Sequence, residues 1–117
     1  MRRDPLIYLQ DILDSIDHIA KDTAGLTEEQ FSQTRLVQQA VVRNLEIIGE
    51  AVQRIPDDVQ SLYPTIPWRK IVAMRNKLIY EYFGLKVAVI WKTVQHDLPE
   101  LKKELEQVLK DFSTEEK

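Results

Sequence analysis

Apolar residues recur every three or four positions along most of this chain, the spacing that places them on one face of an α-helix. The first stripe predicts a helix that begins at Asp4 and Pro5, since aspartate followed by proline is a typical helix start. Its members are Leu6, Leu9, Leu13, Ile16, Ile19 and Ala20. Gly25 ends this region, and the sequence TEEQ that begins at Thr27 predicts a capping box that opens a short helical turn.

Two further stripes predict helices in the middle of the chain. The first runs from about Thr34 to Ile55 and stops before Pro56, since the residue before a proline disfavours the helical backbone. Its seam is Val37, Val41, Asn44, Ile48, Ala51 and Ile55. Residues 57–67 form a connector with room for a short helix near 58–63. The next helix opens at residues 67–68 and runs to Tyr82 or Phe83. Its core stripe is Ile71, Met74 and Leu78.

The clearest pattern lies in the last third of the chain and predicts a fourth long helix. The stripe consists of Val87, Trp91, Val94, Leu98, Leu101, Leu105 and Val108. Pro99 falls inside it. Because the apolar seam keeps its phase across the proline, we expect a kinked helix rather than a restart. Residues 111–117 are polar, and we expect them to fray.

Four long helices with short links predict an all-α, up-and-down four-helix bundle with short extra helices. The length suits one domain, which we place at residues 1–110, with 111–117 as a polar C-terminal tail. The second and fourth stripes are wide for so small a bundle. We therefore expect a homodimer, in which a second copy covers part of this apolar surface.

Composition narrows the classes of function. The chain has no cysteine, which rules out disulfides and thiolate metal sites. Its two histidines, His18 and His96, lie far apart in sequence and are expected at exposed helical positions, so we expect neither a metal nor a cofactor. No apolar run suits a membrane span or a signal peptide, and a cytoplasmic location is expected. The net charge of −3 argues against binding nucleic acid through bulk charge.

One stretch concentrates positive charge in this acidic chain. Residues 68–82 hold four basic side chains ahead of their only acid, Glu81. Arg75 is suited to a phosphate because its planar guanidinium can form two parallel hydrogen bonds. Tyr82 falls on the same helical face, two turns on, whereas Tyr80 lies about 140° away round the helix. This makes residues 75–82 the candidate site, although a basic run is also typical of an ordinary solvated helix face.

Nearly the whole chain is covered, in order, by the motifs RNLEIIGEA (43–51), YPTIPW (63–68), RNKLI (75–79), EYFG (81–84), Trp91 and DLP (97–99). Together these motifs resemble the HepT-like family of the HEPN superfamily. The resemblance implies a HEPN-like helical homodimer that acts as the ribonuclease toxin of a pair, with a minimal nucleotidyltransferase as antitoxin. The family's motif is arginine, four residues, histidine, one residue, tyrosine. It falls on Arg75, its polar follower Asn76, and Tyr82, but Tyr80 stands in the place of the histidine.

The resemblance also implies a metal-independent mechanism and roles for these four residues. The RNA 2′-hydroxyl attacks the neighbouring phosphate, arginine holds the phosphate, and histidine serves the proton transfers. A tyrosine, with an unperturbed pKa of about 10, is a poor base at neutral pH, and losing a general acid–base group lowers rates ~10²- to 10⁴-fold. Tyr80 therefore indicates either an engineered inactive variant or a natural member with weakened cleavage.

Further roles follow from the resemblance. The family's antitoxin adds AMP groups to the motif tyrosine, which implies Tyr82 as the acceptor and Tyr80 as a possible competitor. Glu46 and Glu50 lie on the second long helix, where they either orient Arg75 or Arg43 or form ordinary surface ion pairs. The two tryptophans are expected in the core rather than as a platform for base stacking.

Two functions from different classes remain open. The first is an endoribonuclease toxin, inactive or weakened through Tyr80, with Arg75, Asn76, Tyr80 and Tyr82 in its active site. The alternative is a non-catalytic helical dimer that binds RNA or the nucleotidyltransferase partner. Whether the chain is an active enzyme depends on Tyr80.

Overall fold

The computed structural model describes residues 5–80 and 87–115. Most of these residues are helical and none lies in a β-strand, which confirms the predicted all-α class. In chain order, the elements are α1 (Pro5–Thr23), α2 (Glu28–Gln33), α3 (Arg35–Arg54), α4 (Asp57–Ser61), α5 (Trp68–Tyr80), α6 (Val87–Lys92), the π-helical segment η2 (Thr93–Asp97) and α7 (Leu98–Glu115). None of the helices in these ranges is both long and apolar enough to span a membrane.

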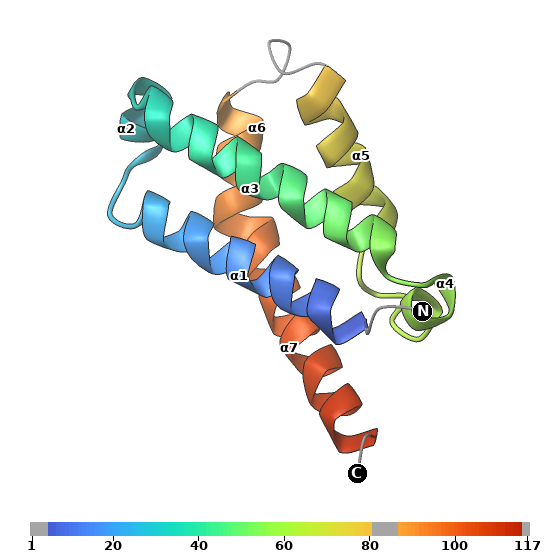
Figure 1. Cartoon of the computed structure of the whole chain (residues 1–117). Coiled ribbons are helices and arrows are strands. Elements are labelled where there is room, and N and C mark those ends of the chain that lie inside the picture. Colours follow the sequence, from blue (N-terminus) through green and yellow to red (C-terminus); the bar gives the residue numbers. More distant parts are fainter. Residues whose placement is uncertain (1–4, 81–86, 116–117) are drawn as a thin grey trace.

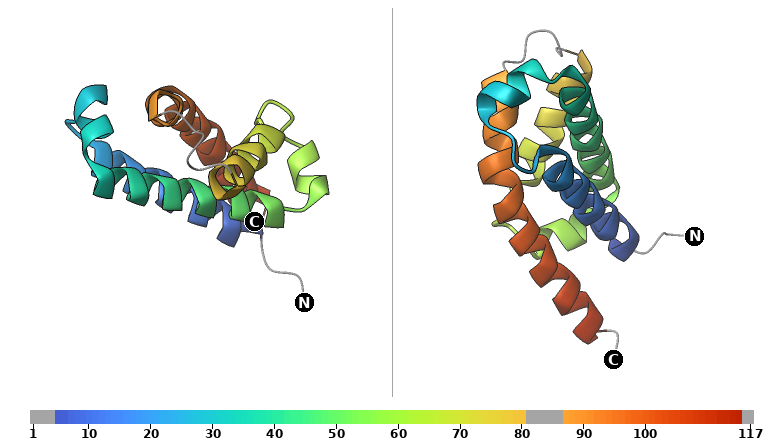
Figure 2. Two further views of the ribbon diagram at one scale, coloured as in Figure 1. Left: turned by 90° about the horizontal axis from the view of Figure 1, so that it is seen from above. Right: turned by 90° about the vertical axis from the view of Figure 1, so that its left-hand side faces the viewer.

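The central helix of the fold is α3. Both α1 and α5 pack along it, with α1 running antiparallel to it in Figure 1. The helices α6 and α7 follow one another in a single long course, so that α7 packs against α1 and α6 against the short α2 (Figure 2). The links between helices are short, which is the arrangement expected of a small bundle.

The core is built largely from the predicted stripes. Its largest fully buried side chains are Phe31, Leu9, Ile12, Ile19, Ile48, Ile55, Leu78, Leu105, Val41, Val52 and Val108. Of the first predicted stripe, only Ala20 is exposed. Phe31 comes from α2, and its ring centroid lies 5.1 Å from that of Trp91. The short helix therefore closes one end of the bundle with an aromatic pair.

The turn between α1 and α3 forms as its sequence predicts. Gly25 has φ +78°, in the left-handed region that favours glycine, just beyond the end of α1. The Thr27 hydroxyl oxygen accepts a hydrogen bond from the Gln30 backbone N–H (3.1 Å), and the Gln30 side chain accepts one from the Thr27 backbone N–H (2.9 Å). This reciprocal pair is the predicted capping box.

The last helix continues across Pro99 without a restart, as predicted, but it differs from its prediction in two ways. The first is that the residues before the proline form the π-helical segment η2, where the Leu98 N–H bonds to the Thr93 carbonyl. The expectation that residues 111–117 fray is wrong as far as Glu115, because α7 extends to that residue. Asp111 accepts a hydrogen bond from the Tyr63 hydroxyl (3.1 Å), and Phe112 packs against the core, so long-range contacts hold this end in place.

Candidate functional site

The candidate site lies on α5, and the structure describes part of it. Arg75 and Asn76 are consecutive residues of this helix, and Tyr80 is its last residue. The Tyr80 side chain and all of Tyr82 lie outside the described residues, as does Asp4, where the first helix was predicted to begin. What the structure brings together is Arg75, Asn76 and the segment of α3 that contains Gly49 and Glu50.

The aliphatic stem of Arg75 packs directly on Gly49. A Cβ atom at position 49 would overlap with the Cβ of Arg75 and would lie 2.7 Å from its Cγ. Side-chain carbons do not approach so closely, so the Arg75 stem fills space that exists only because residue 49 has no side chain. We call this contact between Gly49 and the Arg75 stem the Gly49 notch.

Beyond the notch, polar groups from both helices hold the guanidinium. Nη1 donates a hydrogen bond to Oδ1 of Asn76 (2.9 Å), and Nη2 lies 4.0 Å from Oε1 of Glu50. The Arg75 side chain is 22% exposed. Its Nε is buried and has no hydrogen-bond acceptor among the described residues.

The two glutamates of α3 separate into different pairs. Glu50 faces Arg75, whereas Glu46 lies 3.8 Å from Arg43 one turn away on the same helix. The Arg43 side chain is 65% exposed, so that pair is an ordinary surface ion pair of small energetic value. Of the two alternatives for Glu50, the geometry favours orientation of Arg75.

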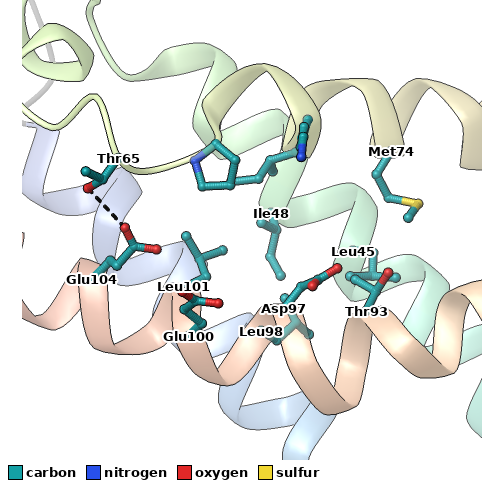
Figure 3. Close-up of a pocket in the computed structure, with 13 residues that line it drawn as sticks. Leu45, Ile48, Thr65, Met74, Thr93, Asp97, Leu98, Glu100, Leu101 and Glu104 are labelled. Carbon is teal, nitrogen blue, oxygen red and sulfur yellow. Dashed lines mark hydrogen bonds between the residues drawn. The ribbon is translucent and has the colours of Figure 1, made fainter.

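A cavity of about 420 Å³ lies beside α5, between that helix, α3 and the start of α7. Its apolar lining includes Ile48 and Leu101, and three carboxylates, Asp97, Glu100 and Glu104, approach it from the side of η2 and α7 (Figure 3). The Thr65 hydroxyl donates a hydrogen bond to Glu104 (3.2 Å). Lys70 is the basic residue of the lining, so carboxylates outnumber it and repel a phosphate, which makes this cavity a poor place for an RNA backbone.

The remaining sequence candidates have structural positions. His18 and His96 are exposed, as expected. Trp68 is buried, and its indole N–H donates to the carbonyls of Gln60 (3.2 Å) and Tyr63 (3.1 Å). Among the described residues, no group of three or more histidine, cysteine or acidic side chains could hold a metal ion.

Sequence reasoning missed Gly49 as a site residue. The signal was present, because glycine is unfavourable in the interior of a helix by about 1 kcal/mol relative to alanine. Its place in the interior of a predicted long helix therefore calls for a packing reason. The sequence alone could not say that the side chain filling this space is that of Arg75.

Comparison with known proteins identifies the family. The profile of the family described as "Ribonuclease HepT-like" matches residues 12–108. A protein of Methanocaldococcus jannaschii named "Putative RNase MJ1216" is 42% identical over 111 residues, which cover 95% of this chain and 92% of that one. "Probable ribonuclease HepT" of Thermococcus cleftensis is 46% identical over 110 residues, 94% of this chain and all of that one. No solved structure matches the chain. With most of its length matched in this way, the chain belongs to the ribonuclease HepT-like family.

Proposed function

We propose that this chain is the ribonuclease toxin of a toxin–antitoxin pair, and that Arg75 binds the RNA phosphate at the reacting centre. Membership of a ribonuclease family supports the class of reaction. The observation that carries the assignment of Arg75 is its geometry. The stem is fixed in the Gly49 notch, and the guanidinium lies between Glu50 and Asn76 on a side chain that is 22% exposed. A phosphate is a stronger hydrogen-bond acceptor for the guanidinium than the Asn76 amide oxygen.

The proposed reaction needs no metal ion. The RNA 2′-oxygen forms a bond to the neighbouring phosphorus, the bond from phosphorus to the 5′-oxygen breaks, and a proton passes from the 2′-hydroxyl to the leaving oxygen through acid–base groups. Arg75 stabilises the negative charge that develops on the phosphate oxygens. Asn76 supports the guanidinium through its hydrogen bond, and Tyr80 and Tyr82 complete the active site on the same segment.

In this proposal, Tyr80 weakens cleavage. A phenol with the unperturbed pKa of about 10 stays protonated at neutral pH. Tyr80 can therefore donate a hydrogen bond but is a poor base. Histidine titrates near neutrality and serves both proton transfers. The chain as it stands should therefore cut RNA slowly or not at all, while it retains the phosphate-binding arginine.

The decisive experiment restores histidine at position 80. Single-stranded RNA is incubated with the parent chain and with Tyr80→His in the presence of a metal chelator. We expect cleavage to rise ~10²- to 10⁴-fold in the variant, the usual scale of a general acid–base contribution. Adding Arg75→Ala should abolish this gain, whereas Arg69→Ala, which removes an exposed arginine of the same helix, should not. A folded Tyr80→His protein that leaves RNA intact would refute the catalytic proposal.

A second candidate function is a non-catalytic helical dimer that holds RNA or a nucleotidyltransferase partner. The observation that favours it is Tyr80 itself, which lacks the acid–base chemistry of the histidine. On this alternative, Tyr80→His cuts nothing, but the parent chain still binds RNA and Arg75→Ala weakens that binding. The same two variants therefore distinguish the candidates.

A further inference from the structure

We propose that Gly49 is a positioning residue, which sets the place of the Arg75 guanidinium from a neighbouring helix without touching RNA. The inference rests on the proposed function in one respect, that Arg75 binds the substrate phosphate. It adds a residue of α3 to a site that the sequence motif confines to α5 and the residues after it.

The backbone does not explain a glycine at this position. Among the described residues, Gly25 is the glycine with positive φ, whereas Gly49 has an ordinary helical conformation that any residue could adopt. A glycine in the interior of a helix also weakens the helix, since it has more conformational freedom to lose on folding than alanine. The reason for Gly49 must therefore be the space that a side chain would occupy.

That space is filled by the first two carbons of the Arg75 side chain, at a point where α5 approaches α3 closely. For a Cβ at position 49, the two nearest atoms are Cβ and Cγ of Arg75, and the third is the carbonyl oxygen of Ile71 at 3.5 Å. The last distance is ordinary van der Waals contact. The Cβ of Arg75, however, is fixed by the α5 backbone and does not move when the side chain changes rotamer. A methyl group at position 49 would therefore push α5, and with it the root of the Arg75 side chain, away from α3.

The notch fixes the start of the side chain, and polar contacts fix its end. Asn76 and Glu50 flank the guanidinium, but both are partly or largely exposed and their contacts are single ones. Contacts of this kind leave the position of a long side chain loosely defined. The buried stem supplies the constraint that they lack, because Cβ and Cγ lie against the α3 backbone at the root of the side chain.

The test is Gly49→Ala in the Tyr80→His background. Displacement of a substrate-binding group by about 1 Å lowers rates on the order of 10²-fold, and we expect a loss of this size in kcat/KM. Ala51→Gly is the matched control, since it makes the reverse exchange in the same helix, about 200° round the axis from position 49. It weakens α3 without filling the notch and should leave kcat/KM within about threefold of the background. Parent-like kcat/KM in a folded Gly49→Ala protein would overturn the proposal.

A double-variant comparison separates positioning from general damage. If Gly49→Ala acts through the root of Arg75, it should lower the free energy of unfolding in the Tyr80→His background but cause no such loss once Arg75→Gly is present, because glycine has no Cβ to overlap. An equal additional loss in that background would show that the effect does not pass through Arg75. Should Gly49→Ala fail to fold, Gly49→Ala combined with Arg75→Gly removes both overlapping carbons and should restore the helical circular dichroism signal. A double variant as unfolded as the single one contradicts the notch.

One further measurement does not depend on cleavage. The Nε–H group of Arg75 gives a nuclear magnetic resonance signal whose frequency reports its surroundings, and burial should slow its exchange with water. We expect this signal to shift and to exchange faster in Gly49→Ala but not in Ala51→Gly. If Tyr80→His cuts no RNA, the proposed function fails while this comparison still decides whether Gly49 positions Arg75.

Discussion

Replacing Arg75 by methionine should abolish RNA binding and yet leave the free energy of unfolding nearly unchanged. Methionine keeps the Cβ and Cγ atoms that pack on Gly49, so the notch stays filled. It removes the guanidinium, including the buried Nε that has no acceptor in the described part of the chain. The variant therefore separates the packing of this side chain from its charge, which Arg75→Ala cannot do.

The expected magnitude follows from the two contacts of the guanidinium and from its buried Nε, which has no acceptor among the described residues. An unpaired buried N–H costs about 1–3 kcal/mol, and this cost disappears in the variant. The hydrogen bond to the exposed Asn76 contributes about 0.5–1.5 kcal/mol, and the pairing with Glu50 at 4.0 Å, whose side chain is 43% exposed, contributes at most about 1 kcal/mol. Gain and loss nearly cancel, so we expect the free energy of unfolding to change by less than about 1 kcal/mol.

The assay is urea denaturation followed by helical circular dichroism, in parallel with RNA binding. Leu78→Ala, at a residue of the same helix that is 2% exposed, is the control for a structural loss and should cost about 2–5 kcal/mol. A structural ion pair broken in a core typically costs about 3–5 kcal/mol. If Arg75→Met lowers the free energy of unfolding by that much, or if its RNA affinity stays within twofold of the parent, Arg75 is a structural residue and the reasoning above is wrong.

Two further predictions concern the end of the bundle and the partner. Phe31→Ala should lower the free energy of unfolding by about 3–5 kcal/mol in urea denaturation, since Phe31 is fully buried against Trp91, whereas Leu36→Ser at a residue 79% exposed should change it by less than about 0.5 kcal/mol. Similar losses in the two variants would show that α2 does not close the core. Incubation with a minimal nucleotidyltransferase partner and ATP should add AMP to Tyr82, detected by intact mass and peptide mapping. The adduct places negative charge on the segment of Arg75 and should weaken RNA binding. Modification that maps only to Tyr80 or to no tyrosine would contradict the assignment of Tyr82.

The sequence was sufficient where local physics decides the structure. Apolar spacing located α1 and α3 to within a residue or two, and the four residues from Thr27 predicted a capping box that forms with both of its hydrogen bonds. These features depend on residues within one or two turns of each other. A single chain segment therefore contains the information that determines them.

The sequence was insufficient where contacts join distant segments. The ordered end of α7 depends on Tyr63, 48 residues before Asp111, and polarity alone indicated fraying. The Gly49 notch likewise depends on which face of α5 meets α3. The sequence predicted Arg75 and Asn76 as residues of the site, but it left open whether Glu50 faced Arg75. The roles of Tyr80 and Tyr82 stay predictions.

The π-helical segment before Pro99 changes the direction in which the last helix presents its side chains. Proline has no N–H to donate, and its ring would collide with the carbonyl of Gln95 in a regular α-helix. A wider turn relieves that collision, and it also winds through a smaller angle per residue than an α turn. The apolar face of α7 is therefore rotated about the helix axis relative to that of α6. One continuous helix can in this way serve two partners, with α6 turned toward α2 and α7 toward α1.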